Sequence, residues 1–98
     1  MMEMTQQYLA GELSVVLGHL QAAATTEASR RHAWSLRQVV ETEPVTVLGS
    51  VTVAALVLTE RLCWASLTRG DMAAFDRQAA VCAELHDFGV CAGLLNGP

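Results

Sequence analysis

The chain has 98 residues, 52% of them hydrophobic and 16% charged, and its formal net charge is −4. This length allows one small domain over residues 1–98, and the high apolar content excludes an intrinsically disordered chain. The acidic balance argues against general nucleic-acid coating, which requires a basic surface. All six basic residues are Arg, a bias that we interpret as GC-rich, bacterial coding.

Apolar side chains recur at steps of three and four along the first part of the chain, which predicts an amphipathic helix over about residues 5–24. Thr25 and Thr26, followed by Glu27, indicate a break and a new N-cap with a carboxylate in the first turn. A second helix is therefore expected over about residues 27–41.

The third segment, at about residues 44–69, opens on Pro44, which suits the first turn of a helix. The β-branched residues between Val45 and Val53 are also typical of a strand. We expect a helix, because the apolar run continues without a turn signal and a lone strand would have no partner. Gly70 suits the left-handed position that ends this helix.

A fourth helix is expected over about residues 71–88, with Asp71 as its N-cap and Gly89 as its end. Its inward residues are predicted to be Phe75, Ala79, Cys82 and Leu85. Four helices joined by short loops imply antiparallel neighbours, so the expected fold is an all-α, up-down helical bundle.

The third helix has apolar residues on two opposite sides. Helical spacing places one set toward the core, namely Leu48, Val51, Ala55, Leu58 and Leu62. The opposite side carries Val53, Val57 and Trp64. A helix that is apolar all round is either central in its own protein or shared between subunits. We therefore expect this second side to form a homodimer interface; the alternative is that the first and fourth helices cover the third from both sides.

Trp34 forms a second candidate site with Arg30, Arg31 and Arg37, its neighbours on the second helix. The apolar face of this helix is expected roughly opposite, at Ala33, Leu36 and Val40. Arg over Trp is a favoured cation–π pair, and such a patch can bind an acidic protein segment, an anion or single-stranded nucleic acid. The alternative is that Arg stems cover an indole half-buried at a helix contact.

The three cysteines, Cys63, Cys82 and Cys91, form no CxxC motif and no small disulfide pattern, which indicates free thiols in a reducing, cytoplasmic compartment. Cys82, His86 and Cys91 could share a metal ion, with Cys63 as a fourth ligand, but their spacing matches no zinc motif. We therefore interpret the cysteines as buried free thiols and expect no cofactor. No catalytic constellation can be assembled, so an enzyme is not expected.

Residues 44–59 carry no charge and raise the question of a membrane helix. The run is shorter than the roughly 20 residues that a spanning helix needs, and Glu43 and Glu60 flank it, so a buried core helix is the better interpretation. Met1 to Gln7 lack the basic and apolar regions of a signal peptide. The sequence thus predicts a small interaction or regulatory protein acting as a homodimer, with a ligand- or metal-binding helical protein as the alternative.

Overall fold

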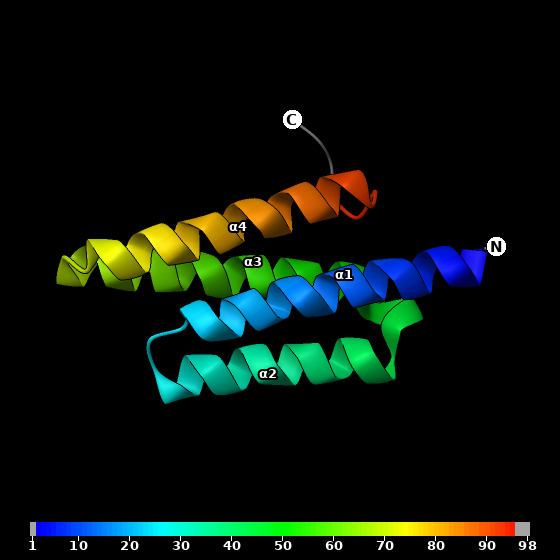
Figure 1. Ribbon diagram of the computed structural model, residues 1–98, viewed down its shortest axis with the longest axis horizontal. Helices are drawn as coiled ribbons and strands as arrows, with labels where there is room; N and C mark the ends of the chain where they lie inside the picture. The colour runs from blue at the N-terminus through cyan, green and yellow to red at the C-terminus, as the bar shows by residue number, and fades with distance from the viewer. Residues whose placement is uncertain (1, 96–98) are drawn as a thin grey trace.

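The computed structural model describes the backbone of residues 2–95 and the side chains of residues 6–43 and 47–95. Four helices follow one another (Figure 1): α1 (Met2–Ala23), α2 (Glu27–Thr42), α3 (Pro44–Arg69) and α4 (Met72–Cys91). Successive helices run in opposite directions, and residues 2–95 contain no strand. The expected all-α bundle is therefore confirmed, including a helix through the β-branched segment at residues 45–53.

Capping residues set two of the helix starts and one helix end. Thr26 Oγ1 accepts a hydrogen bond from the backbone N–H of Ser29 at 3.1 Å, and the Asp71 carboxylate accepts one from the N–H of Ala74 at 3.1 Å. Gly70, between α3 and α4, has a φ of 74°, the left-handed conformation that a β-carbon disfavours. These residues confirm the turns expected from the sequence.

The end of α4 differs from the prediction. Gly89 does not end the helix, because α4 continues to Cys91 and Gly93 takes the left-handed conformation with a φ of 73°. A β-carbon on Gly89 would lie 2.6 Å from Cγ of Leu95 and 3.3 Å from Cγ2 of Thr52. A larger residue at this position would therefore require the Leu95 side chain to shift, and the constraint on Gly89 is one of space and not of backbone conformation.

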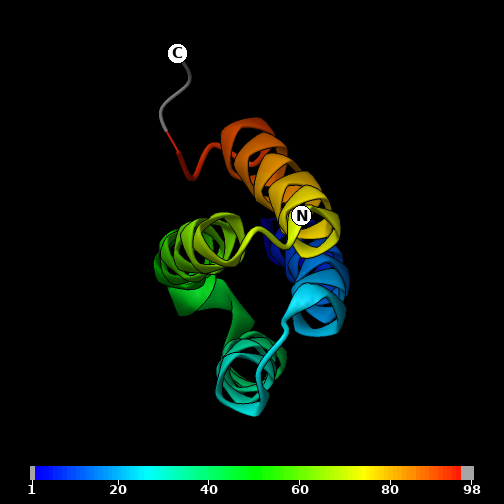
Figure 2. The same cartoon turned by 90° about the vertical axis from the view of Figure 1, so that its left-hand side faces the viewer.

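The four helices form a flattened bundle with extents of 47 × 30 × 16 Å. Seen end-on, α1 and α3 lie in the middle, with α4 on one side of this pair and α2 on the other (Figure 2). Both α1 and α3 contact all the other helices, whereas the described residues of α2 and α4 share no contact. One side of α3 is consequently left without a neighbouring helix.

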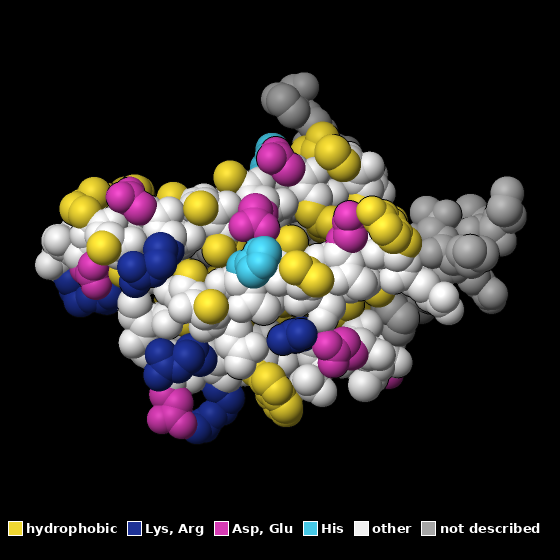
Figure 3. Space-filling model, in the orientation of Figure 1, with side chains coloured by type: hydrophobic (Ala, Val, Ile, Leu, Met, Phe, Trp, Pro, Cys, Tyr) yellow, Lys and Arg dark blue, Asp and Glu magenta, His cyan; other side chains and the backbone are white. Residues whose placement is uncertain are grey.

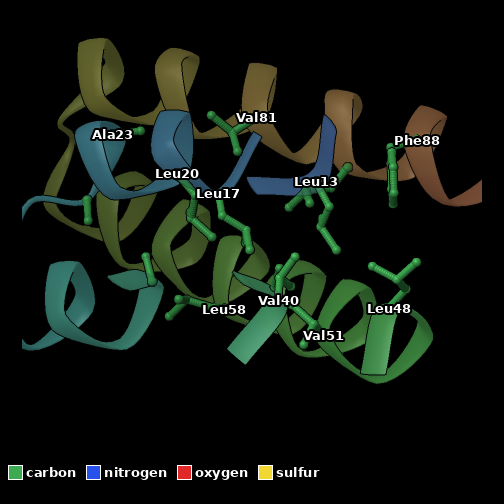
Figure 4. Packing of buried hydrophobic residues seen from close by; sticks show 14 of the residues in the cluster. Leu13, Leu17, Leu20, Ala23, Val40, Leu48, Val51, Leu58, Val81 and Phe88 are labelled. Carbon is green, nitrogen blue, oxygen red and sulfur yellow. The ribbon is translucent and has the colours of Figure 1, made fainter. Parts of the chain in front are cut away.

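The hydrophobic core runs along the inner sides of the helices, where Leu13, Leu17 and Leu20 of α1 are fully buried (Figure 4). The residues predicted to face the core from α3 are all buried, namely Leu48, Val51, Ala55, Leu58 and Leu62. Ala33 and Val40 of α2 are buried as well. Helical periodicity therefore identified the inner faces of the first three helices.

The inner face of α4 was predicted less well. Leu85 is buried as expected, but Phe75, Ala79 and Cys82 are only partly buried. The buried residues of α4 are Ala74, Gln78, Val81, Leu85, Phe88 and Gly89. The helix is thus rotated relative to the prediction, and a second apolar stripe of α4 lies away from the core.

Gln78 occupies one of the core positions of α4. Its side-chain oxygen accepts a hydrogen bond from the hydroxyl of Ser66 at 2.6 Å, and its amide nitrogen donates to the carbonyl of Ala23 at 3.1 Å. Both ends of the buried amide therefore have partners, which allows a polar residue to occupy a core position. The spacing of apolar residues cannot reveal such a position.

Candidate functional site

An apolar stripe runs along the side of α3 that no other helix covers. It consists of Val53, Val57, Trp64 and Leu67, whose exposed fractions are 49%, 43%, 69% and 43%. We call these residues the α3 stripe. Val53, Val57 and Trp64 lie opposite the buried face, where the sequence placed them, whereas Leu67 was not foreseen. The exposure of the stripe contradicts the alternative in which α1 and α4 cover α3 from both sides.

A groove of about 870 Å³ lies between α3 and α4, beside the α3 stripe. We call it the α3–α4 groove. Its apolar lining is Leu56, Cys63, Trp64 and Leu67 from α3, and Phe75, Ala79, Cys82 and Ala83 from α4. Glu60, His86 and Asp87 add polar groups to the lining. Because Trp64 and Leu67 belong to both features, the stripe and the groove form one continuous surface.

The groove is not predicted from the sequence, because periodicity assigns Phe75, Ala79 and Cys82 to the core. A helix with two apolar stripes gives the same steps of three and four on each, so periodicity does not say which stripe is buried. A signal was nevertheless present: α3 and α4 each carry an apolar stripe beyond what one small core can bury.

The two thiols that line the groove are poor nucleophiles. Burial raises the pKa of the Cys63 thiol, and the neighbouring Cys82 and the Glu60 carboxylate raise it further. Burial also raises the pKa of Cys82, again with a contribution from Glu60. The thiolate is the form that attacks electrophiles and binds metals, so the raised pKa values make these thiols part of an apolar wall.

The proposed metal ligands do not come together as a site. All three cysteines are free, but Cys63 and Cys82 are only partly buried and Cys91 is exposed, so the prediction of buried thiols is wrong for Cys91. Cys82 and His86 both line the α3–α4 groove. Within the part of the chain that the structure describes, no group of three or more His, Cys, Asp or Glu residues could hold a metal ion.

Trp34 is 49% exposed on α2, and two of its Arg neighbours are engaged elsewhere. Arg30 donates to the carbonyl of Ala24 at 3.3 Å, just beyond the end of α1, where carbonyls lack partners within the helix. Arg31 forms an ion pair with Glu27 at 2.9 Å. Both guanidinium groups therefore have local hydrogen-bond or ion-pair partners.

The third Arg of this patch, Arg37, connects α2 to α1. It forms an ion pair with Glu41 at 3.3 Å and donates to the hydroxyl of Ser14 at 3.1 Å. In the view of Figure 3, the Arg side chains near the start of α2 lie next to acidic ones, and hydrophobic side chains are scattered among polar groups. The neighbouring carboxylates lower the net positive charge of the patch.

By length and composition, α3 could also cross a membrane over Val47–Arg69, although 39% of its most apolar window is buried in the protein. Glu60 and Arg61 lie near the middle of this span. A charged residue at the centre of a bilayer costs about 2.5–3.5 kcal/mol on insertion. These two charges favour a helix that packs on protein over one that spans lipid.

Comparisons with protein-family models, with curated proteins and with solved structures give no match. The fold and the surface therefore define the class of protein on their own. It is a small four-helix protein whose third and fourth helices present a continuous apolar surface.

Proposed function

We propose that this protein is a small, non-enzymatic interaction protein that acts as a homodimer through the α3 stripe and the α3–α4 groove. The observation that carries the proposal is that Trp64 is 69% exposed and lies on the same side of α3 as three further exposed apolar residues. Contiguous exposed apolar surface marks a binding site, because association removes it from water. Trp is also among the residues that dominate binding energy at interfaces.

A second copy of the chain would have to cover more than the α3 stripe. A stable interface buries about 800 Å² on each partner. The stripe runs from Val53 to Leu67, about 21 Å at 1.5 Å per residue, so the stripe alone is smaller than such an interface. The α3–α4 groove and the adjoining surface of α4 would have to contribute the rest.

The charges on the surface also suit self-association. Two copies with a net charge of −4 each repel one another where acidic surfaces meet. Along the α3 stripe, however, the charged residues are Glu60 and Arg61, whose charges cancel. The stripe is locally neutral, which lowers the repulsion between two copies there, whereas the groove adds the Asp87 carboxylate.

Trp64→Arg tests the proposed interface. We expect the wild type to have the mass of a dimer at micromolar concentration and the variant to have the mass of a monomer, measured by sedimentation or light scattering. The substitution places a charge in the middle of an apolar contact, which costs desolvation energy. Because Trp64 is mostly exposed in the subunit, the variant should keep its helical circular dichroism spectrum.

Trp34→Arg is the matched control, since it makes the same chemical change at the half-exposed indole of α2. We expect this variant to remain dimeric. A wild type that stays monomeric at high micromolar concentration, or a dimer that survives Trp64→Arg, contradicts the proposal. A monomeric wild type that sediments with phospholipid vesicles would indicate that the apolar surface binds lipid.

A further inference from the structure

The α3–α4 groove differs in polarity between its two ends. α3 and α4 run antiparallel (Figure 1), and the hydrogen bond of 2.6 Å between Ser66 and Gln78 sets these two residues level with each other. Both helices rise by about 1.5 Å per residue, so Glu60, before Ser66 on α3, lies within about one helical turn of His86 and Asp87, which follow Gln78 on α4. All three of these polar residues line the groove. The end of the groove away from the turn between the two helices is therefore polar.

The other end of the groove, next to Gly70, is apolar and aromatic. Its lining consists of Trp64 and Leu67 from α3, and Phe75 and Ala79 from α4. Aromatic rings bury a large apolar area, and their faces also attract cations. This end of the groove can therefore hold the apolar body of a ligand, including that of a positively charged one.

The charge of the groove is negative. Its lining contains the carboxylates of Glu60 and Asp87 but no Arg, and the chain contains no Lys. The ion pairs of the described residues include neither carboxylate. Arg61 is next to Glu60 in the sequence, but it is turned by about 100° around the helix and does not line the groove. Glu60 also contributes to the raised pKa values of the Cys63 and Cys82 thiols, so its charge acts within the groove.

We propose that the α3–α4 groove binds a small organic cation with an apolar body, and that its positive charge lies beside the carboxylates of Glu60 and Asp87. The body of the ligand packs on the rings of Trp64 and Phe75. The groove has a volume of about 870 Å³, within the range of about 300–1,000 Å³ that is typical of small-ligand sites. A carboxylate at an apolar surface attracts a cation more strongly than it would in bulk water. One copy of the chain forms this site, so the inference does not rest on the proposed homodimer.

Two ions of similar size and opposite charge, tetraphenylphosphonium and tetraphenylborate, test the proposal. Trp34→Phe leaves Trp64 as the only Trp, so its fluorescence reports binding in the groove. We expect this parent variant to bind the cation at least about tenfold more tightly than the anion, because the two carboxylates repel the anion. A second copy that covers the groove competes with both ions equally. The ratio of the two dissociation constants therefore does not depend on dimerisation.

Neutralising both carboxylates of the groove should remove the preference for the cation. With Glu60→Gln and Asp87→Asn combined, we expect the two ions to bind within about threefold of each other. Both side chains are exposed, so the helical circular dichroism spectrum should be unchanged. Glu27→Gln combined with Glu43→Gln is the matched control, since it removes the same net charge from exposed residues outside the groove. The control should keep the preference of the parent variant.

Phe75→Ala tests the apolar end of the groove. We expect both ions to bind at least about threefold more weakly, because the lost ring reduces the apolar contact of either one, and the ratio of their dissociation constants to stay the same. Equal affinities of the two ions in the parent variant, or no binding of the cation up to its solubility limit, would overturn the proposal. So would a preference that survives the loss of both groove carboxylates, or one that the control loses as well.

Discussion

Gln78 joins three helices through one side chain. It contacts Ser66 of α3 and the carbonyl of Ala23, the last residue of α1. Carbonyl groups in the last turn of a helix have no partner within that helix, so the Gln78 amide caps α1 as well as linking it to α4. A buried amide is tolerated only with such partners, because an unpaired polar group in a core costs its full desolvation energy.

Replacing Gln78 with Met tests the value of these contacts. The substitution keeps the size of the side chain but leaves the Ser66 hydroxyl and the Ala23 carbonyl without this partner. We expect the free energy of unfolding to fall by about 1–3 kcal/mol, measured by urea denaturation at a fixed protein concentration. Gln21→Met, at a half-buried position of α1, serves as the control and should change stability by less than about 0.5 kcal/mol. Equal effects of both substitutions would contradict a stabilising role of the two Gln78 hydrogen bonds.

Among the helices, α3 and α4 show where the spacing of apolar residues identifies the buried face and where it does not. The predicted core residues of α3 are buried, and the residues predicted on the opposite side are exposed. Exposed Leu67 and the buried polar residues Thr52, Thr59 and Ser66 were not predicted. The apolar stripe of α4 around Phe75 was assigned to the core, although the core position in that turn belongs to Gln78. The C-terminal end of α4 was also predicted too early, since Gly89 was taken as a helix end and is a packing position.

Two glycines inside helices make a matched pair that tests this packing. Gly11 of α1 is exposed, and beyond its chain neighbours and the adjacent backbone of its own helix no atom lies within 4 Å of the place its β-carbon would take. Gly89 of α4 instead faces Leu95 and Thr52. Gly11→Ala should raise stability by up to about 1 kcal/mol through helix propensity. Gly89→Ala should show no such gain, because the new methyl group must displace Leu95. Thermal unfolding compares the two, and equal gains would exclude a close contact at Gly89.

For the whole molecule, the flattened arrangement decides which surfaces remain free. The central pair α1 and α3 has α2 and α4 on either side (Figure 2). α3 therefore packs on α1, α2 and α4 and still leaves the α3 stripe uncovered. The high hydrophobic content of the chain, 52%, thus supplies both a core and an exposed apolar surface. In the proposed homodimer, burial of that surface by a second copy would link stability to protein concentration.

The melting temperature of the wild type should consequently rise with protein concentration. A tenfold increase changes the free energy of a dimer by about 1.4 kcal/mol. With an unfolding entropy of about 2.1 cal/mol/K per residue over two chains, this corresponds to about 3 °C. Differential scanning calorimetry over two decades of concentration measures this shift. Trp64→Arg should melt at a temperature that does not depend on concentration, and a wild type that behaves in the same way would argue against the dimer.

Local spacing along the chain is sufficient for the four helices, for the caps at Thr26 and Asp71, and for the two faces of α3. These features depend on backbone preferences and on residues a few positions apart. In the observed orientation of α4, the buried Gln78 has partners that lie 12 and 55 positions away in the sequence. Contacts over such separations form only when the helices pack, so the tertiary structure alone decides which apolar stripe is buried and which is free to bind.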